Sequence, residues 1–232
     1  MKSLLPLALL SHFVLSAEIL SNFHPPSGKE KTVVLTFDAC GGPGGWGYDE
    51  ALIQTLCREK IPATLFITAL WASRNSNTFA ALKTNALFEI ENHGASHRPL
   101  SASGQSIYGL LGTPSLDEAR REVQGGAAFI QKETGRRPKF FRPAALYFEN
   151  ETSALVEKLG YRIAAFSVNG DAGASFSPAQ VKKTLLAAKT GDIVIFHMNH
   201  PEGGTAQGIR EALENSAGNG FRFVRLSDVS SN

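Results

Sequence analysis

Hydrophobic and polar positions along the chain alternate between two kinds of segment. Short β-branched and apolar runs, such as residues 31–38 (KTVVLTFD) and 192–197 (DIVIFH), are typical of buried strands. Residues 48–60 carry apolar side chains at every third or fourth position, a spacing that predicts an amphipathic helix. The longest predicted helix covers residues 115–134, because Ser115 can cap its start and the next residue after it is a glycine.

The same two patterns recur to the end of the chain. Further strands are predicted at residues 62–70, 86–91, 139–142, 161–168 and 221–226. Further helices are predicted at residues 151–159, 178–189 and 206–217. Strands that alternate with helices form parallel sheets with helical crossovers. About seven such strands in a chain of this size favour an α/β barrel over an open sheet.

The amino terminus has the layout of a secretory signal peptide. In residues 1–17 one lysine precedes an apolar stretch that ends in small residues, and the stretch is shorter than the roughly 20 residues that a membrane span needs. We therefore expect export to the periplasm or the medium, no stable membrane span after cleavage, a leader over residues 18–30 and a domain over residues 31–232. An uncleaved amino-terminal anchor is the alternative.

Composition narrows the function classes. Hydrophobic residues make up 43% of the 232 residues, enough to bury a core, so the chain as a whole is not disordered. A formal charge of +2 gives no support for a nucleic-acid partner. Cys40 and Cys57 cannot form a four-thiolate zinc site. They could pair in an oxidising compartment, but the unpaired state is favoured because they are predicted near opposite ends of one β/α unit.

Polar side chains gather where the predicted strands end, which is where α/β folds place their chemistry. These residues are Asp38, His93, His97, Arg142, Asn169, Asp171 and His197. His93 and His97 are four residues apart, so on a helical turn they could share one cation, although two surface histidines would give the same pattern. Taken together, the residues predict a shared site more strongly than any one of them does.

Five motifs, in order, resemble those of the polysaccharide deacetylase family, which is built on the NodB homology domain (carbohydrate esterase family 4). They are TFDAC at residues 36–40, HGASH at 93–97, FRPAALY at 141–147, SVNGDAG at 167–173 and IVIFH at 193–197. The resemblance covers nearly all of the chain after the signal peptide. It implies a distorted (β/α)₇ barrel.

The resemblance also implies a role for each motif residue. His93 and His97 would bind a divalent metal, commonly zinc, and Asp38 would act as the general base. His197 would be the general acid that protonates the leaving amine, and Arg142 would orient Asp38. The metal and a backbone N–H near Ala144 or Ala145 would hold the oxyanion.

Three departures from the family pattern bear on this reading. The second aspartate of the family's first motif, a metal ligand, is Ala39 here. The residues that could replace it are Asp38 itself, Cys40, Asp49 and His200. Ala145 stands where the family has a tyrosine, and Asp171 is shifted within its motif. Ala145 and Asp171, together with Trp46 as a ring that could stack on a sugar, are the expected substrate contacts. Asp171 could also tune His197.

The expected function is that of an exported, metal-dependent hydrolase that removes N-acetyl groups from the amino sugars of a polysaccharide. Peptidoglycan, a chitin-like polymer and an exopolysaccharide all fit as the N-acetylated glycan. Two alternatives remain: a glycan-binding barrel without activity, which Ala39 favours, and a metal-free amidase. The joint presence of Asp38, Arg142 and His197 favours an enzyme, because binding alone needs neither a base nor an acid.

Overall fold

The computed structural model describes residues 19–25, 28, 30–214 and 220–229. In this part of the chain, one parallel sheet has the strand order β1-β6-β5-β4-β3-β2-β8-β7, and β9 pairs with the first half of β2. The strands are β1 (Ile19–Leu20), β2 (Lys31–Ala39), β3 (Ala63–Ile67), β4 (Phe88–Asn92), β5 (Phe140–Phe141), β6 (Arg162–Ala164), β7 (Val168–Asn169), β8 (Ile193–His197) and β9 (Phe221–Val224).

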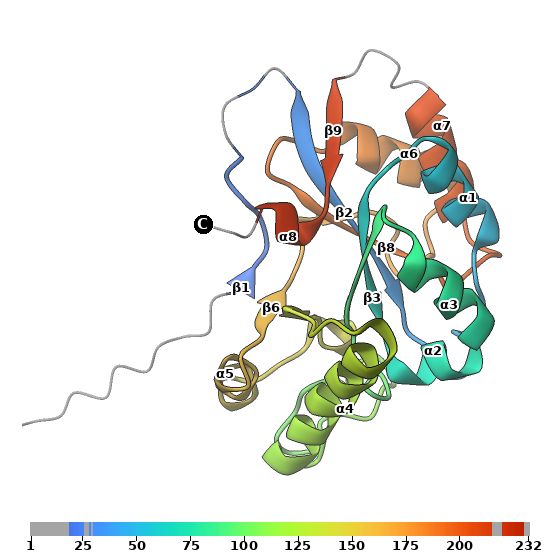
Figure 1. The fold of residues 1–232 in the computed structure, drawn as a ribbon. Coiled ribbons are helices and arrows are strands. Elements are labelled where there is room, and N and C mark those ends of the chain that lie inside the picture. Colours follow the sequence, from blue (N-terminus) through green and yellow to red (C-terminus); the bar gives the residue numbers. More distant parts are fainter. Residues whose placement is uncertain (1–18, 26–27, 29, 215–219, 230–232) are drawn as a thin grey trace, which may run out of the picture.

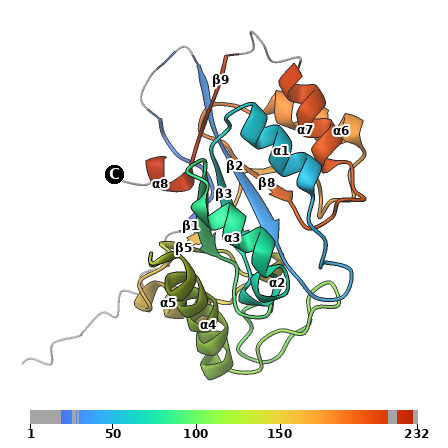
Figure 2. The same cartoon turned by 45° about the vertical axis from the view of Figure 1, so that its right-hand side comes forward.

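Helices cover the outer face of this sheet. They are α1 (Glu50–Arg58), α2 (Ala69–Arg74), α3 (Ser76–Thr84), α4 (Leu116–Thr134), α5 (Asn150–Lys158), α6 (Pro178–Ala187), α7 (Thr205–Glu214) and the short α8 (Leu226–Val229), with a 3₁₀ turn at Ala144–Leu146. Figures 1 and 2 show α1, α6 and α7 together on one side of the molecule, and α4 and α5 on the other. The sheet curls without closing, so the architecture is the α/β half-barrel form of the predicted (β/α)₇ fold.

Strand β2 runs through the centre of the sheet and shows how the core is divided. Successive side chains of a strand point to opposite faces. Accordingly Val33 and Leu35 pack in the large core beneath the helices, whereas Val34 packs in a second cluster with Phe66 and Phe140. This alternation decides where the polar residues at the end of β2 point.

Several predicted elements are confirmed. Helix α4 begins after Ser115, whose hydroxyl accepts the backbone N–H of Glu118, and it ends at Gly135 in the left-handed conformation (φ 72°). The strand predicted over residues 62–70 is wrong at its end. Thr68 accepts the backbone N–H of Trp71 and starts α2, so the strand stops at Ile67.

The predicted strand over residues 161–168 divides into β6 and β7, and α3 is a helix that the pattern did not indicate. Part of the predicted leader joins the sheet: β1 pairs with β6, and Leu20 and Phe23 are buried in the second cluster. The predicted signal peptide, residues 1–17, lies outside the described residues. Within the described ranges, no helix has the length and apolar character that a membrane crossing requires.

Candidate active site

The predicted site residues come together at the carboxyl ends of the parallel strands. Asp38 lies at the end of β2, His93 directly after β4, Arg142 after β5 and His197 at the end of β8. A cavity of about 520 Å³ opens there. It is lined by Asp38, Cys40, His97, Tyr108, Leu110, Arg142, Ala145, Leu146, Phe166, Asn169, Ala172, Gly173, Ile195 and His197.

Asp38 and Arg142 form a buried ion pair. Arg142 Nη1 donates to Asp38 Oδ1 at 2.7 Å and to the Thr36 hydroxyl at 2.9 Å, and both charged side chains are almost fully buried. Its other nitrogens donate to the carbonyls of Ala164 and Ala165. Burial works to raise the pKa of Asp38, but the Arg142 charge and the nearby imidazoles lower it below its ordinary value. Asp38 is therefore held as a carboxylate, the form that a general base requires.

His93 and His97 lie against each other beside this pair. Their ring centroids are 4.8 Å apart, and His93 Nε2 lies 3.5 Å from Asp38 Oδ2. The carbonyl of Arg142 lies 2.7 Å from His93 Nδ1, which places the ring proton on Nδ1 and leaves Nε2 as a lone-pair donor. Burial lowers the pKa of His93, and burial together with His93 lowers the pKa of His97 to about 3, so both rings are neutral.

Cys40 joins the two histidines. Its Sγ lies 3.6 Å from His93 Nε2, and the donor atoms of Cys40, His93 and His97 all lie within 4.8 Å of one another. One thiol and two imidazoles are a donor set that suits zinc. Burial raises the pKa of the Cys40 thiol well above its ordinary value, so a cation in contact with the sulfur would be needed to hold it as a thiolate. The residues present fit a divalent metal.

Helix α4 holds the loop that carries the two histidines. Glu122 of α4 is buried and accepts the backbone N–H groups of Ser96 and Arg98. Gly126 sits one turn further along, where a Cβ atom would come within 2.7 Å of the Gly94 carbonyl oxygen. His97 itself has a φ of 61°, a conformation that costs free energy for any residue other than glycine. The packing against α4 compensates for that strain and fixes the loop.

His197 is held from behind by Asp171. His197 Nδ1 lies 2.9 Å from Asp171 Oδ1, and the backbone N–H of His197 donates to Oδ2 at 2.6 Å. The Thr205 hydroxyl donates to the same Oδ2. Burial works to lower the pKa of His197, but the hydrogen bond to Asp171 and its charge raise it above the ordinary value. The imidazole is thereby favoured in the protonated form that a general acid requires.

Not every sequence-predicted residue reaches the cavity. Asp171, expected to contact substrate or to tune His197, is fully buried behind His197 and does not line the cavity, so its position suits the second role. Trp46 is also absent from the lining, and the Arg74 guanidinium stacks on its ring at 4.8 Å from the centroid. Ala145 does line the cavity, with a φ of 55°.

The structure distinguishes between the candidates for the third metal ligand by their distance from the two histidines. Asp49 caps α1 by accepting the backbone N–H of Leu52, and His200 pairs with Glu202 at 2.8 Å. Neither belongs to the three-residue cluster around His93, whereas Cys40 does. Asp38 Oδ2 is as close to His93 Nε2, at 3.5 Å, but its carboxylate is paired with Arg142 and is not part of that cluster. Cys40 and Cys57 are both free thiols, as expected.

The sequence did not indicate the turn that carries Tyr108 and Leu110 to one side of the cavity. Tyr108 and Gly109, both with positive φ, form a tight turn between Ile107 and Leu110, which exchange two backbone hydrogen bonds. Tyr108 is 91% exposed on this turn and lines the cavity. A glycine between apolar residues is a turn signal that could have indicated the hairpin, but not that the hairpin reaches the site.

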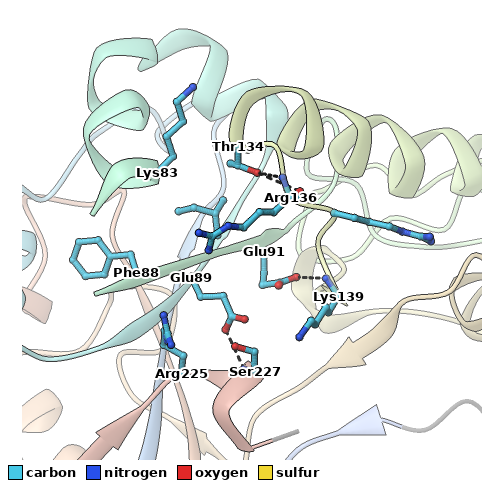
Figure 3. Close-up of a pocket in the computed structure, with 11 residues that line it drawn as sticks. Lys83, Phe88, Glu89, Glu91, Thr134, Arg136, Lys139, Arg225 and Ser227 are labelled. Atoms are coloured by element: carbon cyan, nitrogen blue, oxygen red, sulfur yellow. Dashed lines mark hydrogen bonds between the residues drawn. The ribbon is translucent and has the colours of Figure 1, made fainter. Parts of the chain in front are cut away.

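A second cavity, of about 430 Å³, lies at the opposite end of the sheet, where β4 begins. Figure 3 shows Glu89 and Glu91 of that strand with Arg136, Lys139 and Arg225 around them. Glu91 accepts the backbone N–H groups of Lys139 and Phe140. None of the residues predicted for the active site lines this cavity.

The sequence profile of a family described as polysaccharide deacetylase matches residues 26–164, which is more than half of the chain. This chain belongs to the polysaccharide deacetylase family. The matched range includes Asp38, His93, His97 and Arg142, whereas His197 follows it. Deacetylases of this family are hydrolases that act on carbon–nitrogen bonds other than peptide bonds, and they are generally metal-dependent. A search of curated protein sequences finds no significant match.

Solved structures with this deacetylase fold include three that we compare directly. A CE4 family pseudoenzyme from Bacillus anthracis is 20% identical, with a TM-score of 0.73 over 93% of this chain and 69% of that chain. The Bc1960 peptidoglycan N-acetylglucosamine deacetylase is 18% identical, with a TM-score of 0.73 over 92% of each chain. The Xyl-CE4 domain of a multidomain xylanase from the hindgut metagenome of Trinervitermes trinervoides is 24% identical, with a TM-score of 0.67 over 87% and 90%. At these identities the comparison establishes the fold.

Proposed function

We propose that this protein is an exported, metal-dependent hydrolase that removes N-acetyl groups from the amino sugars of a polysaccharide. The observation that carries the proposal is the meeting of three units at one cavity: the Asp38–Arg142 ion pair, the Cys40–His93–His97 cluster and the His197–Asp171 pair. A base held ionised and an acid held protonated on one cavity are the two proton-transfer groups that amide hydrolysis needs. Export rests on the sequence pattern of residues 1–17.

In the proposed reaction Asp38 takes a proton from the attacking water. The Arg142 guanidinium keeps the carboxylate ionised and fixes its direction. A metal held by His93, His97 and a third donor would supply Lewis-acid polarisation of the water and of the acetamide carbonyl. The backbone N–H of Ala145 helps to hold the oxyanion of the tetrahedral intermediate.

His197 then donates its proton to the departing amine of the sugar. Asp171 accepts from Nδ1, so Nε2 is the nitrogen left to face the substrate. The cavity volume of about 520 Å³ is large enough for one sugar ring with its acetamide, and the apolar side chains at its rim can contact the ring faces.

The test is acetate release from a panel of N-acetylated glycans: peptidoglycan, chitin-like oligomers and an acetylated exopolysaccharide. We expect release by the wild type after addition of zinc or cobalt, loss of release with a chelator, and release slowed by about 10²–10⁴-fold in Asp38→Asn. Retention of a glycan without acetate release would favour a glycan-binding barrel. Release that persists in metal-stripped protein would favour a metal-free amidase.

A further inference from the structure

The end of strand β2 turns two neighbouring side chains in opposite directions. Ala39, which stands where the family has an aspartate ligand, is fully buried in the apolar core beneath the helices. Cys40 follows directly and comes back to the face that carries Asp38, because residues two apart on an extended chain share a face. In this register Cys40, and not residue 39, is directed at His93.

The spacing between Cys40 and His93 matches that of two ligands on one metal. Tetrahedral zinc bonds of about 2.3 Å to sulfur and about 2.0–2.1 Å to nitrogen separate the two donor atoms by about 3.6 Å. The distance from Cys40 Sγ to His93 Nε2 is 3.6 Å. Without a metal the same contact is a hydrogen bond from the Cys40 thiol to the Nε2 lone pair, so a cation that displaces the thiol proton would find both donor atoms already facing each other.

The surroundings prepare the imidazoles for this role. The Arg142 carbonyl engages His93 Nδ1 and so directs Nε2 toward Cys40. His97 adopts a left-handed backbone conformation that brings its ring to 4.8 Å from that of His93. Glu122 holds the connecting loop through the backbone N–H groups of Ser96 and Arg98.

We propose that Cys40 is the third protein ligand of the metal centre, a thiolate that takes the place of the missing carboxylate at residue 39. This inference rests on the proposed metal dependence but not on the identity of the reaction. A thiolate with two imidazoles favours zinc and cobalt, whereas a carboxylate with two imidazoles also accepts harder cations such as manganese and magnesium. The centre therefore differs in metal preference from one that is completed by aspartate.

The direct test reads the metal–sulfur bond itself. X-ray absorption of the zinc-loaded full chain is expected to show one sulfur neighbour at about 2.3 Å together with nitrogen or oxygen neighbours. Cobalt titration is expected to give a sulfur-to-cobalt charge-transfer band in wild type and in Cys57→Ser, because Cys57 lies away from the cluster, beside Asn85. Cys40→Ser should lose the band, and its zinc affinity should fall by more than the about 10–100-fold that loss of an outer hydrogen-bond partner causes.

Cys40→Asp provides the second variant, which should bind metal without the band and should gain affinity for manganese relative to zinc. A zinc centre without a sulfur neighbour in the wild type would overturn the proposal, and this measurement holds even if a variant fails to fold. An unchanged band in Cys40→Ser would overturn it as well. The outcomes for ligand and reaction are separable. A sulfur–metal bond without acetate release from any glycan would contradict only the proposed function. Metal-dependent release without a sulfur–metal bond would contradict only the role of Cys40 as a ligand.

Discussion

Asp171→Asn isolates the contribution of the carboxylate behind His197. In the wild type Asp171 accepts from His197 Nδ1, from the His197 backbone and from Thr205. An asparagine of the same shape is neutral and must turn its NH₂ group toward one of these donors. A hydrogen bond to a charged group contributes about 1.5–3 kcal/mol, and one pKa unit corresponds to about 1.36 kcal/mol. The pKa of His197 is therefore expected to fall by about one to two units.

The assay is the pH dependence of kcat for acetate release. His197 acts in its protonated form, so activity is lost as the pH rises through the pKa of His197, which Asp171 raises in the wild type. In Asp171→Asn this basic limb should move to lower pH by about one to two units, and above both pKa values kcat should fall about 10–100-fold. Asp117→Asn, on the exposed face of α4, is the matched control.

A thermal melt of both variants checks that the fold is kept. A lower kcat with an unmoved basic limb would refute the reasoning, because a purely structural effect of the substitution has no cause to shift a titration. An unmoved limb together with an unchanged kcat would show that Asp171 does not set the pKa of His197.

Three further outcomes follow from buried contacts. Arg142→Met leaves the Asp38 carboxylate without its partner, and urea unfolding should show a loss of about 3–5 kcal/mol; a loss below about 1 kcal/mol would contradict a buried ion pair. Burial raises the pKa of Glu91 well above 4.5, so the folded chain keeps that proton to higher pH than the unfolded chain does, and the free energy of unfolding should fall as the pH rises from 4.5 through the raised pKa. Glu91→Gln should flatten this slope in urea midpoints measured across pH. An unchanged slope in the variant would contradict the assignment of the slope to Glu91. Gly126→Ala should destabilise the chain by about 1–3 kcal/mol and weaken zinc binding. Gly125→Ala serves as the control, because a Cβ there meets only the Ala95 Cβ at 3.1 Å. Equal effects of the two substitutions would contradict the close packing of Gly126 against the histidine loop.

The elements that the sequence predicted best are those with local signals. Helix α4 carries its cap and its stop within its own sequence, at Ser115 and Gly135. The strand before Thr68 was predicted too long, because an apolar run does not reveal that a threonine hydroxyl will cap a following helix. The division of β6 from β7 is set by pairing partners on different strands, which periodicity cannot indicate.

The site residues likewise differ in whether a local sequence signal could identify them. Asp38, His93, His97, Arg142 and His197 could be assembled from motifs because each motif ends a strand of one parallel sheet. The choice of Cys40 over Asp49 and His200 depended on distances between side chains. The place of Asp171 behind His197 and the support from Glu122 depended on contacts between elements far apart in the sequence.

The most direct measurement is a double-mutant comparison of acetate release by the wild type, Asp38→Asn, His197→Ala and the combined variant, all loaded with zinc. If base and acid serve one hydrolytic centre, each single change should lower kcat by about 10²–10⁴-fold, and the combined change should cost little more than the larger of the two, because groups that act as a unit are not additive. Multiplicative losses, or full activity in either single variant, would contradict a shared centre.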